Sequence, residues 1–214
     1  MMKSKKAAKV KSDTSAEQRI INAARKVFHE KGYDATRTRD IAEEAGINLA
    51  LLNYYFRSKE KLFDIIVFET MEKFFQSLKE VFNDEKTSIE QKVEALVEKY
   101  VDLLSRHPEI PLFILSEVRK RPAELVQRIG MKELVMQSFF LRQYMEEANS
   151  GKIKMLHPLH FIMNILGLTV FPFIASPILR SIGNLSPADW NDLMQERKKM
   201  VPVWIKSILN PESL

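Results

Sequence analysis

The residues best suited to binding another molecule are concentrated in one stretch, which reads TRTRDIAEEAGINLALLNYYF from Thr36 to Phe56. Its spacing predicts two short helices joined at Ala45-Gly46-Ile47, because Gly46 can take a positive φ without a Cβ clash. The small side chains of Ala42 and Ala45 would let these helices approach closely. This is the pattern of a helix-turn-helix, whose second helix presents its N-terminal and outer residues to the major groove of DNA.

The distribution of charge independently favours a nucleic-acid partner. Residues 1–57 carry 12 Lys and Arg against 7 Asp and Glu, whereas residues 58–214 carry 21 of each sign, so the whole net charge of +5 lies in the first quarter. Five cations form an acid-free tail before Asp13, namely Lys3, Lys5, Lys6, Lys9 and Lys11. A basic end on a neutral body indicates a polyanion, first nucleic acid and second an anionic membrane. For the tail alone, a merely solvated segment is an equal alternative.

The sequence gives little support for a metal site or for catalysis. His157 and His160 lie one helical turn apart without an acidic neighbour, so histidines of a helix start and a pocket are favoured over a metal site. The chain has no cysteine, which excludes disulfides and thiolate catalysis and agrees with a cytoplasmic location. Neither GxSxG, nor a P-loop, nor a GxGxxG after a strand occurs. We therefore expect no catalytic residue, no metal and no cofactor.

The elements that position the binding stretch are expected to be helices throughout. Hairpin dipeptides and period-two runs are missing, which predicts an all-α protein of about nine helices. Capping boxes at Thr14–Glu17 and Ser88–Gln91 predict two helix starts, and Gly32 predicts the end of the first helix. Ser58 is expected to cap a long helix, and Pro122 to open another that reaches about Asn149.

This pattern predicts two domains. Residues 1–57 would form a three-helix helix-turn-helix domain that binds DNA, with a basic flexible tail over residues 1–12. Residues 58–214 would form a helical bundle for ligand binding and dimerisation.

Residues 155–179 contain no Asp, Glu, Lys or Arg and are long enough to span a bilayer. The same stretch holds three prolines, Asn164 and two histidines, and it lacks Trp and Tyr at its ends. A helix that is apolar all round can instead be buried between protein layers. We expect such burial, in a core or a dimer bundle, and no membrane insertion.

Residues 16–63 resemble the N-terminal domain of the tetracycline-repressor-like (TetR) family of transcriptional regulators. The matching pieces, in order, are Ile21 to Phe28, Glu30-Lys31-Gly32-Tyr33, Thr38 to Ala42, Ala45-Gly46-Ile47, Leu52 to Phe56, and Ser58-Lys59-Glu60 with Leu62. The resemblance is specific because several separated motifs agree in order and spacing. Beyond residue 63 only length and helical character match, as expected for a family whose C-terminal halves diverge.

The resemblance implies which residues bind DNA: Thr38, Arg39, Asn48, Leu49, Ala50, Asn53, Tyr54, Tyr55 and Lys59. Asn53 departs from the family, which commonly has Tyr there, although Asn can still donate to a phosphate or read adenine. Leu49 is either a thymine-methyl contact or a neutral spacer. Lys59 matches a phosphate-binding lysine at the start of a helix. Aromatic residues at helical spacing usually pack inside, which favours a core position for Tyr55.

The apolar and aromatic surplus of the second half indicates a cavity between helices, the usual ligand site in a helical domain of this size. The candidate pocket residues are Phe75, Tyr100, Phe113, Phe139, Tyr144, His160 and Asn164. For any one of them, a place in a solid core is the alternative.

A homodimer is expected, since one short recognition helix contacts too few bases, whereas two helices one helical turn apart can read a palindrome. The predicted helices Pro158–Phe171 and Pro187–Ile208 would form its interface. The whole pattern predicts a repressor of operator DNA that a small, largely apolar effector releases by changing the separation of the two recognition helices. The helix from Ser58 would transmit that motion. The alternative function is a small-molecule-binding helical protein whose basic end contacts a membrane surface.

Overall fold

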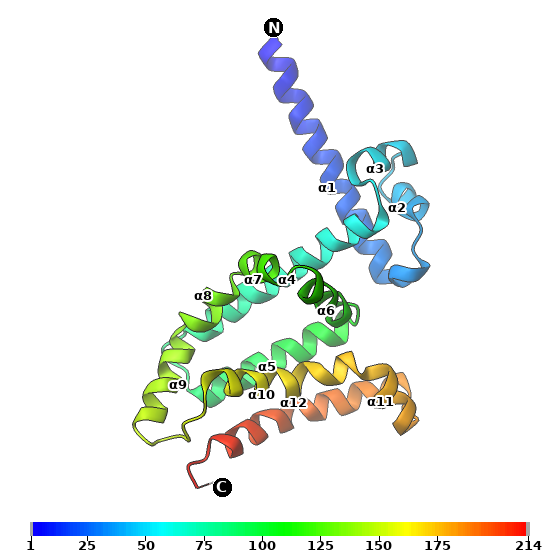
Figure 1. Ribbon diagram of the computed structural model, residues 1–214. Coiled ribbons are helices and arrows are strands. Elements are labelled where there is room, and N and C mark those ends of the chain that lie inside the picture. The colour runs from blue at the N-terminus through cyan, green and yellow to red at the C-terminus, as the bar shows by residue number, and fades with distance from the viewer. Residues whose placement is uncertain (1, 213–214) are drawn as a thin grey trace. The chain divides into compact units, whose positions relative to one another are not determined.

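A computed structural model describes the backbone of residues 2–212 and the side chains of residues 16–212. All regular elements of this part are helices, as predicted (Figure 1). In chain order they are α1 (Met2–Ala35), α2 (Thr38–Glu44), α3 (Leu49–Phe56), α4 (Lys59–Asn83), α5 (Ile89–Arg106), α6 (Ile110–Lys120), α7 (Pro122–Ile129), α8 (Met131–Met136), α9 (Phe139–Asn149), α10 (Pro158–Ile174), α11 (Ser176–Gly183) and α12 (Pro187–Leu209). The expected number of about nine is therefore too low.

Part of the excess comes from the helix expected between Pro122 and Asn149, which is interrupted twice. Gly130 takes a left-handed conformation with φ of 65° and ends α7. Ser138 then caps α9, because its hydroxyl accepts a hydrogen bond from the backbone of Leu141 at 3.2 Å. The prediction of one long helix here is wrong, since Gly130 ends one helix and Ser138 begins another.

The chain divides into two compact units, Met1–Thr70 and Met71–Leu214. The division falls inside α4, whereas the boundary expected from the sequence lay between residues 57 and 58.

The first unit consists of α1 to α3 and the beginning of α4 around one apolar core. Ile20, Ile41, Leu52 and Leu62, one from each helix, are fully buried there. The backbone of α1 is interrupted at Gly32, where φ is 76° and ψ is 168°. Gly32 thus ends the first helical stretch as expected, but with extended rather than left-handed ψ.

The start of α1 differs from its prediction. The capping box at Thr14–Glu17 does not begin the helix, because α1 already starts at Met2. Residues 1–12, the predicted flexible tail, include Met1, which lies outside the described residues, and helical backbone from Met2 onwards. The side chains of this segment also lie outside the described part of the chain.

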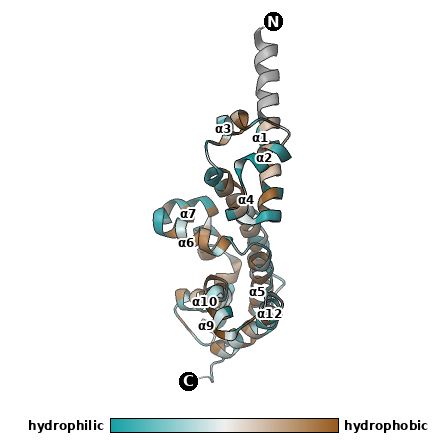
Figure 2. Ribbon diagram, turned by 90° about the vertical axis from the view of Figure 1, so that its right-hand side faces the viewer, coloured by the Kyte–Doolittle hydropathy of each residue, from teal (hydrophilic) through white to brown (hydrophobic). Residues whose placement is uncertain are grey.

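In the second unit, α5 packs against α10 and α12, and Figure 1 shows these three helices side by side. The capping box at the start of α5 is confirmed, since the Ser88 hydroxyl accepts from the Gln91 backbone at 3.2 Å and the Gln91 side chain accepts from the Ser88 backbone at 2.9 Å. Polar and apolar residues share the same helices (Figure 2), as expected of amphipathic elements.

No single helix within the described residues has the length and hydropathy needed to cross a bilayer. Only α10 and α11 taken together meet that requirement, and they are bent by 69° at their junction.

Candidate nucleic-acid interface

The turn between α2 and α3 has the geometry that fixes one short helix against another. Gly46, with φ of 64°, donates to the Glu43 carbonyl at 3.0 Å, and Ile47 donates to the Ala42 carbonyl at 3.0 Å. This pair of hydrogen bonds is a Schellman motif, which ends α2 and satisfies its last carbonyl groups. The predicted helix-turn-helix geometry is therefore present.

Helix α3 has a buried face and an exposed face. Leu52 and Phe56 are buried in the core of the first unit. Ala50 and Asn53 are exposed, and Tyr54 is 78% exposed, the value expected of a side chain held for an external partner and not for the core. Leu52 and Phe56 are four positions apart, so they lie on one stripe of α3 that holds the helix in place.

Asn48 forms the N-cap of α3, and its side-chain oxygen accepts a hydrogen bond from the Leu51 backbone at 2.8 Å. The amide NH2 of Asn48 is left to donate elsewhere. Leu49 is half-buried at the start of the helix. Tyr55 is half-buried and packs against the apolar core, as its spacing predicted, while its ring makes an edge contact with that of Tyr54 at 5.4 Å between centroids.

The start of α2 presents Arg39 as an exposed side chain and Thr38 as a half-buried one. Asp40 stabilises this start, because its carboxylate accepts a hydrogen bond from the Arg37 backbone at 2.9 Å and lies 3.3 Å from the Lys31 ammonium. The backbone hydrogen bond from Arg37, assisted by Lys31, lowers the pKa of Asp40.

The cations of the first unit divide into paired and unpaired groups. Arg25, Lys26 and Lys31 form ion pairs with Glu69, Glu44 and Asp40. Among the side chains of residues 16–212, the exposed arginines Arg37, Arg39 and Arg57 have no ion-pair partner. Arg37 precedes α2, Arg39 lies in its first turn and Arg57 follows α3, so all three could contact phosphate groups.

Lys59, expected to bind a phosphate, makes internal contacts instead. Its ammonium donates to the carbonyls of Tyr33 at 2.8 Å and Thr36 at 3.0 Å, and it lies 4.2 Å from the centre of the Tyr33 ring. The available signal was the end of α1, whose last carbonyls need donors from elsewhere. Sequence reasoning did not use it.

In the second unit, two small apolar cavities of about 90 and 50 Å³ share Phe75 and Tyr100 as lining residues. These two are the candidate pocket residues that the structure brings together. The lining of neither cavity includes the buried Phe113, the half-buried Phe139 and Asn164, or the exposed His160.

Tyr144, also a pocket candidate, is fully buried and fully hydrogen-bonded. Its hydroxyl donates to the Leu156 carbonyl at 2.9 Å and accepts from the Leu156 backbone N–H at 3.0 Å. Its ring stacks on that of Phe161, with centroids 4.5 Å apart. These contacts make Tyr144 a structural link between α9 and the segment that precedes α10.

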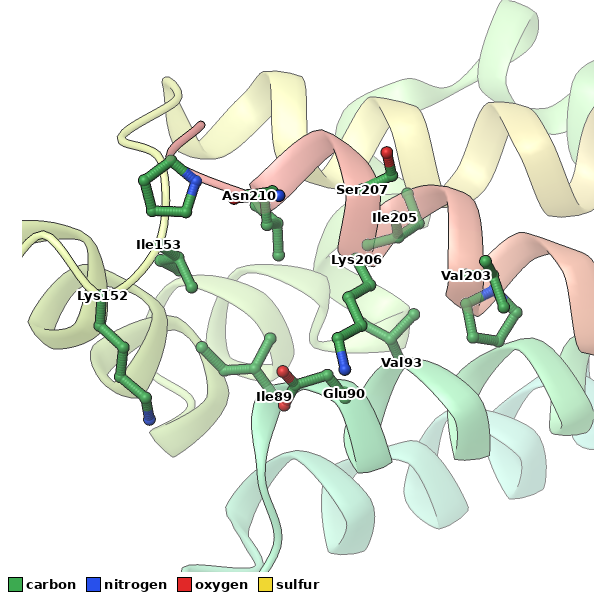
Figure 3. A pocket seen from close by; sticks show the side chains of 13 residues that line it. Ile89, Glu90, Val93, Lys152, Ile153, Val203, Ile205, Lys206, Ser207 and Asn210 are labelled. Carbon is green, nitrogen blue, oxygen red and sulfur yellow. The ribbon is translucent and has the colours of Figure 1, made fainter. Parts of the chain in front are cut away.

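A more open cavity of about 460 Å³ lies between the start of α5 and the end of α12 (Figure 3). It contains none of the candidate pocket residues and has Lys152, Lys206 and Glu90 in its lining. The side chains of Lys206 and Glu90 point toward each other in Figure 3. A hydrogen bond from its own backbone N–H, assisted by the Ser88 side chain and then by the two lysines, lowers the pKa of Glu90. Within the described residues, no group of three or more His, Asp or Glu side chains is placed to hold a metal ion.

Comparisons with known proteins agree with this geometry. Residues 20–66 match the family model described as bacterial regulatory proteins of the tetR family. The chain is 26% identical over 201 residues to a probable HTH-type transcriptional regulator, YttP, of Bacillus subtilis, covering 91% of this chain and 94% of the relative.

Two solved structures support the fold. One is a regulator of the TetR/AcrR family from Thermobifida fusca, with 21% identity, a TM-score of 0.64 and coverage of 87% of this chain and 96% of that chain. The other is the regulator FadR from Bacillus subtilis in complex with stearoyl-CoA, with 23% identity, a TM-score of 0.52 and coverage of 86% and 96%. These two structures share the fold. The match over residues 20–66, the helix-turn-helix there and the regulator relative show that this chain is a DNA-binding transcriptional regulator whose N-terminal domain is of the tetR family type.

Proposed function

We propose that this regulator is a homodimeric repressor that reads operator DNA with the exposed face of α3 and the start of α2, and that a small, largely apolar effector releases it. The observation that carries the DNA-reading part is the division of α3 into a buried stripe and an outer face bearing the 78% exposed Tyr54. The proposed direct contacts are Thr38, Arg39, Asn48, Leu49, Ala50, Asn53 and Tyr54. Tyr55 and Lys59 instead position them, because their contacts are within the first unit.

The proposal of a dimer is supported by exposed apolar side chains on the last helices. Phe171 is 58% exposed on α10, Ile178 and Ile182 are 65% and 78% exposed on α11, and Val203 is 64% exposed on α12. Large exposed apolar residues that gather on neighbouring elements mark an interface. A two-fold dimer through this surface would also give each operator half-site one copy of α3.

The two cavities that share Phe75 and Tyr100 support an apolar effector site. Phe75 belongs to α4, the helix that begins in the DNA-binding unit, so an effector beside it would contact the element expected to transmit the signal. The FadR structure in complex with stearoyl-CoA indicates only that a protein of this fold can hold a molecule with an apolar acyl chain.

The test is a pair of substitutions, Arg39→Ala and Tyr54→Ala, in the full chain. Binding to duplexes selected from random DNA is measured between 50 and 200 mM salt, conditions over which phosphate contacts strongly affect affinity. Each variant should lose at least about tenfold in affinity while its unfolding curve stays unchanged. Arg119→Ala, an exposed arginine of α6, is the matched control and should bind normally. Normal binding by both test variants would contradict the proposed contacts.

A further inference from the structure

We infer that the effector is an uncharged, compact apolar molecule with a single hydrogen-bonding group, and that the Tyr100 hydroxyl recognises this group. The inference deepens the proposed function and rests on it, because it places the effector in the two cavities of the second unit. It names the chemical class that these cavities accept and the residue that determines specificity.

The side chains that line the two cavities are almost all apolar. The cavity of about 90 Å³ lies among residues of α4, α5, α8, α9 and α10, and that of about 50 Å³ among residues of α4, α5, α6 and α10. Every side chain lining either one is a hydrocarbon, a methionine or a proline, except that of Tyr100. Tyr100 therefore carries the one side-chain hydrogen-bonding group among the lining residues. The smaller cavity is lined by apolar surface alone, so a molecule would meet the Tyr100 hydroxyl in the larger cavity.

A charged effector does not suit such a lining. A carboxylate, phosphate or ammonium group loses its hydration on entry, and no side chain of opposite charge lines either cavity. A neutral carbonyl, ester or hydroxyl group loses less hydration and recovers one hydrogen bond from Tyr100. The lining consequently selects for uncharged molecules.

The state of the Tyr100 hydroxyl supports a ligand role. Within residues 16–212 it has no hydrogen-bond partner, and it is not one of the fully enclosed polar atoms, so it is accessible to a molecule that enters beside it. Burial raises the pKa of Tyr100, so the hydroxyl stays protonated and can donate. The ring is held by an edge contact with Phe74, with centroids 4.6 Å apart. A fixed, protonated and unpartnered donor is well suited to recognise one acceptor atom.

The cavity volumes limit the size of the effector. A dry cavity of about 150 Å³ accepts benzene, and each cavity here is smaller. Because Phe75 and Tyr100 line both cavities, a shift of these two side chains would join them into one space. Together the two cavities come close to the volume that accepts benzene, so the joined space sets an upper limit of about one ring or a short branched chain. A long acyl chain requires a larger rearrangement of the helices.

The experiment measures binding of three probes to the full chain by titration calorimetry at pH 7. The probes are toluene, which has no polar group, acetophenone, which has one acceptor, and benzoate, which is charged. Acetophenone should bind about threefold to tenfold more tightly than toluene, which is the effect of one net hydrogen bond. Benzoate should bind at least about tenfold more weakly than acetophenone. Tyr100→Phe should keep the affinity for toluene and abolish the preference for acetophenone.

Two further variants test the location. Val135→Phe fills the larger cavity and should abolish binding of acetophenone, whereas Val126→Phe, at an exposed position of α7, should leave it unchanged. The inference is overturned if no probe binds, if benzoate binds as tightly as acetophenone, or if Tyr100→Phe retains the preference.

The inference and the proposed function can fail separately. If acetophenone binds through Tyr100 but never releases DNA, recognition of an uncharged acceptor by Tyr100 stands and the proposed release of DNA from this site fails. If a charged effector releases DNA and its binding is unaffected by Val135→Phe, the proposed repressor stands and the inference fails.

Discussion

The Lys59 ammonium lies 2.8 Å from the carbonyl oxygen of Tyr33 and 4.2 Å from the centre of the Tyr33 ring. The same ammonium donates to Thr36, whose hydroxyl in turn donates to the Gly32 carbonyl at 2.6 Å. These contacts join the first turn of α4 to the end of α1 and supply donors to carbonyls that have none within the helix. They fix the ends of the segment that carries α2 and α3.

Lys59→Met should therefore act mainly on stability. Removing two hydrogen bonds from a charged donor should lower the free energy of unfolding by about 1–3 kcal/mol, measured by urea denaturation. The dependence of log K for DNA on log salt concentration should change by clearly less than about 0.9, the loss expected when a phosphate contact is removed. Lys59→Arg keeps the charge and should recover part of the stability. Unchanged stability with a full loss of slope would make Lys59 a phosphate ligand.

The arrangement around Lys59 also shows where sequence reasoning was insufficient. The motif containing Lys59 marked the position as important, but a lysine at a helix start is equally able to bind a phosphate or a backbone carbonyl. Whether the lysine binds a phosphate or a carbonyl depends on where α1 ends. The sequence does not give that position, because it is set by the tertiary contact between Tyr33 and Lys59. The same limit applies to Tyr144, whose aromatic spacing did not reveal its hydrogen bonds to Leu156.

The fold itself could be predicted more fully, because helical periodicity and capping residues act locally. The positive φ of Gly46 and the buried stripe of α3 follow directly from the residues between Thr36 and Phe56. Periodicity did not reveal the break at Gly130, since a glycine can also lie within a helix at modest cost. Thr14 did not begin α1, because the Lys- and Ala-rich residues before it are good helix formers.

Gly46 should be sensitive to substitution because of its conformation and not for lack of space. A Cβ atom would meet nothing within 4 Å, but φ is +64°. Gly46→Ala should lower the free energy of unfolding by about 1–2 kcal/mol. Gly46→Asn should cost less, since Asn tolerates the left-handed region. Thermal and urea unfolding of both variants check this order, and equal costs for Ala and Asn would contradict the conformational explanation.

Asp40 should make the free energy of unfolding depend on pH in the acidic range. Its pKa in the folded protein lies below the ordinary value of 3.8, so its contribution to stability is present above about pH 4 and is lost as the pH falls towards the folded pKa. Asp40→Asn should therefore flatten the dependence of the unfolding free energy on pH below about pH 4. Glu43→Gln makes the same charge change on α2 without the hydrogen bond to Arg37 and serves as the control. Identical pH profiles for the two variants would exclude a special role for Asp40.

Tyr100 and Tyr144 allow a matched comparison of two tyrosine hydroxyls. That of Tyr144 is hydrogen-bonded to Leu156, whereas that of Tyr100 has no hydrogen-bond partner among residues 16–212. Tyr144→Phe leaves both backbone groups of Leu156 without their partner and should lower the free energy of unfolding by about 1–3 kcal/mol. Tyr100→Phe removes a hydroxyl without a partner among residues 16–212 and should change it by less than about 0.5 kcal/mol. Urea denaturation of the ligand-free chain measures both values. If Tyr100→Phe proved as destabilising as Tyr144→Phe, the Tyr100 hydroxyl would have an internal structural role, and its assignment to effector recognition would lose its basis.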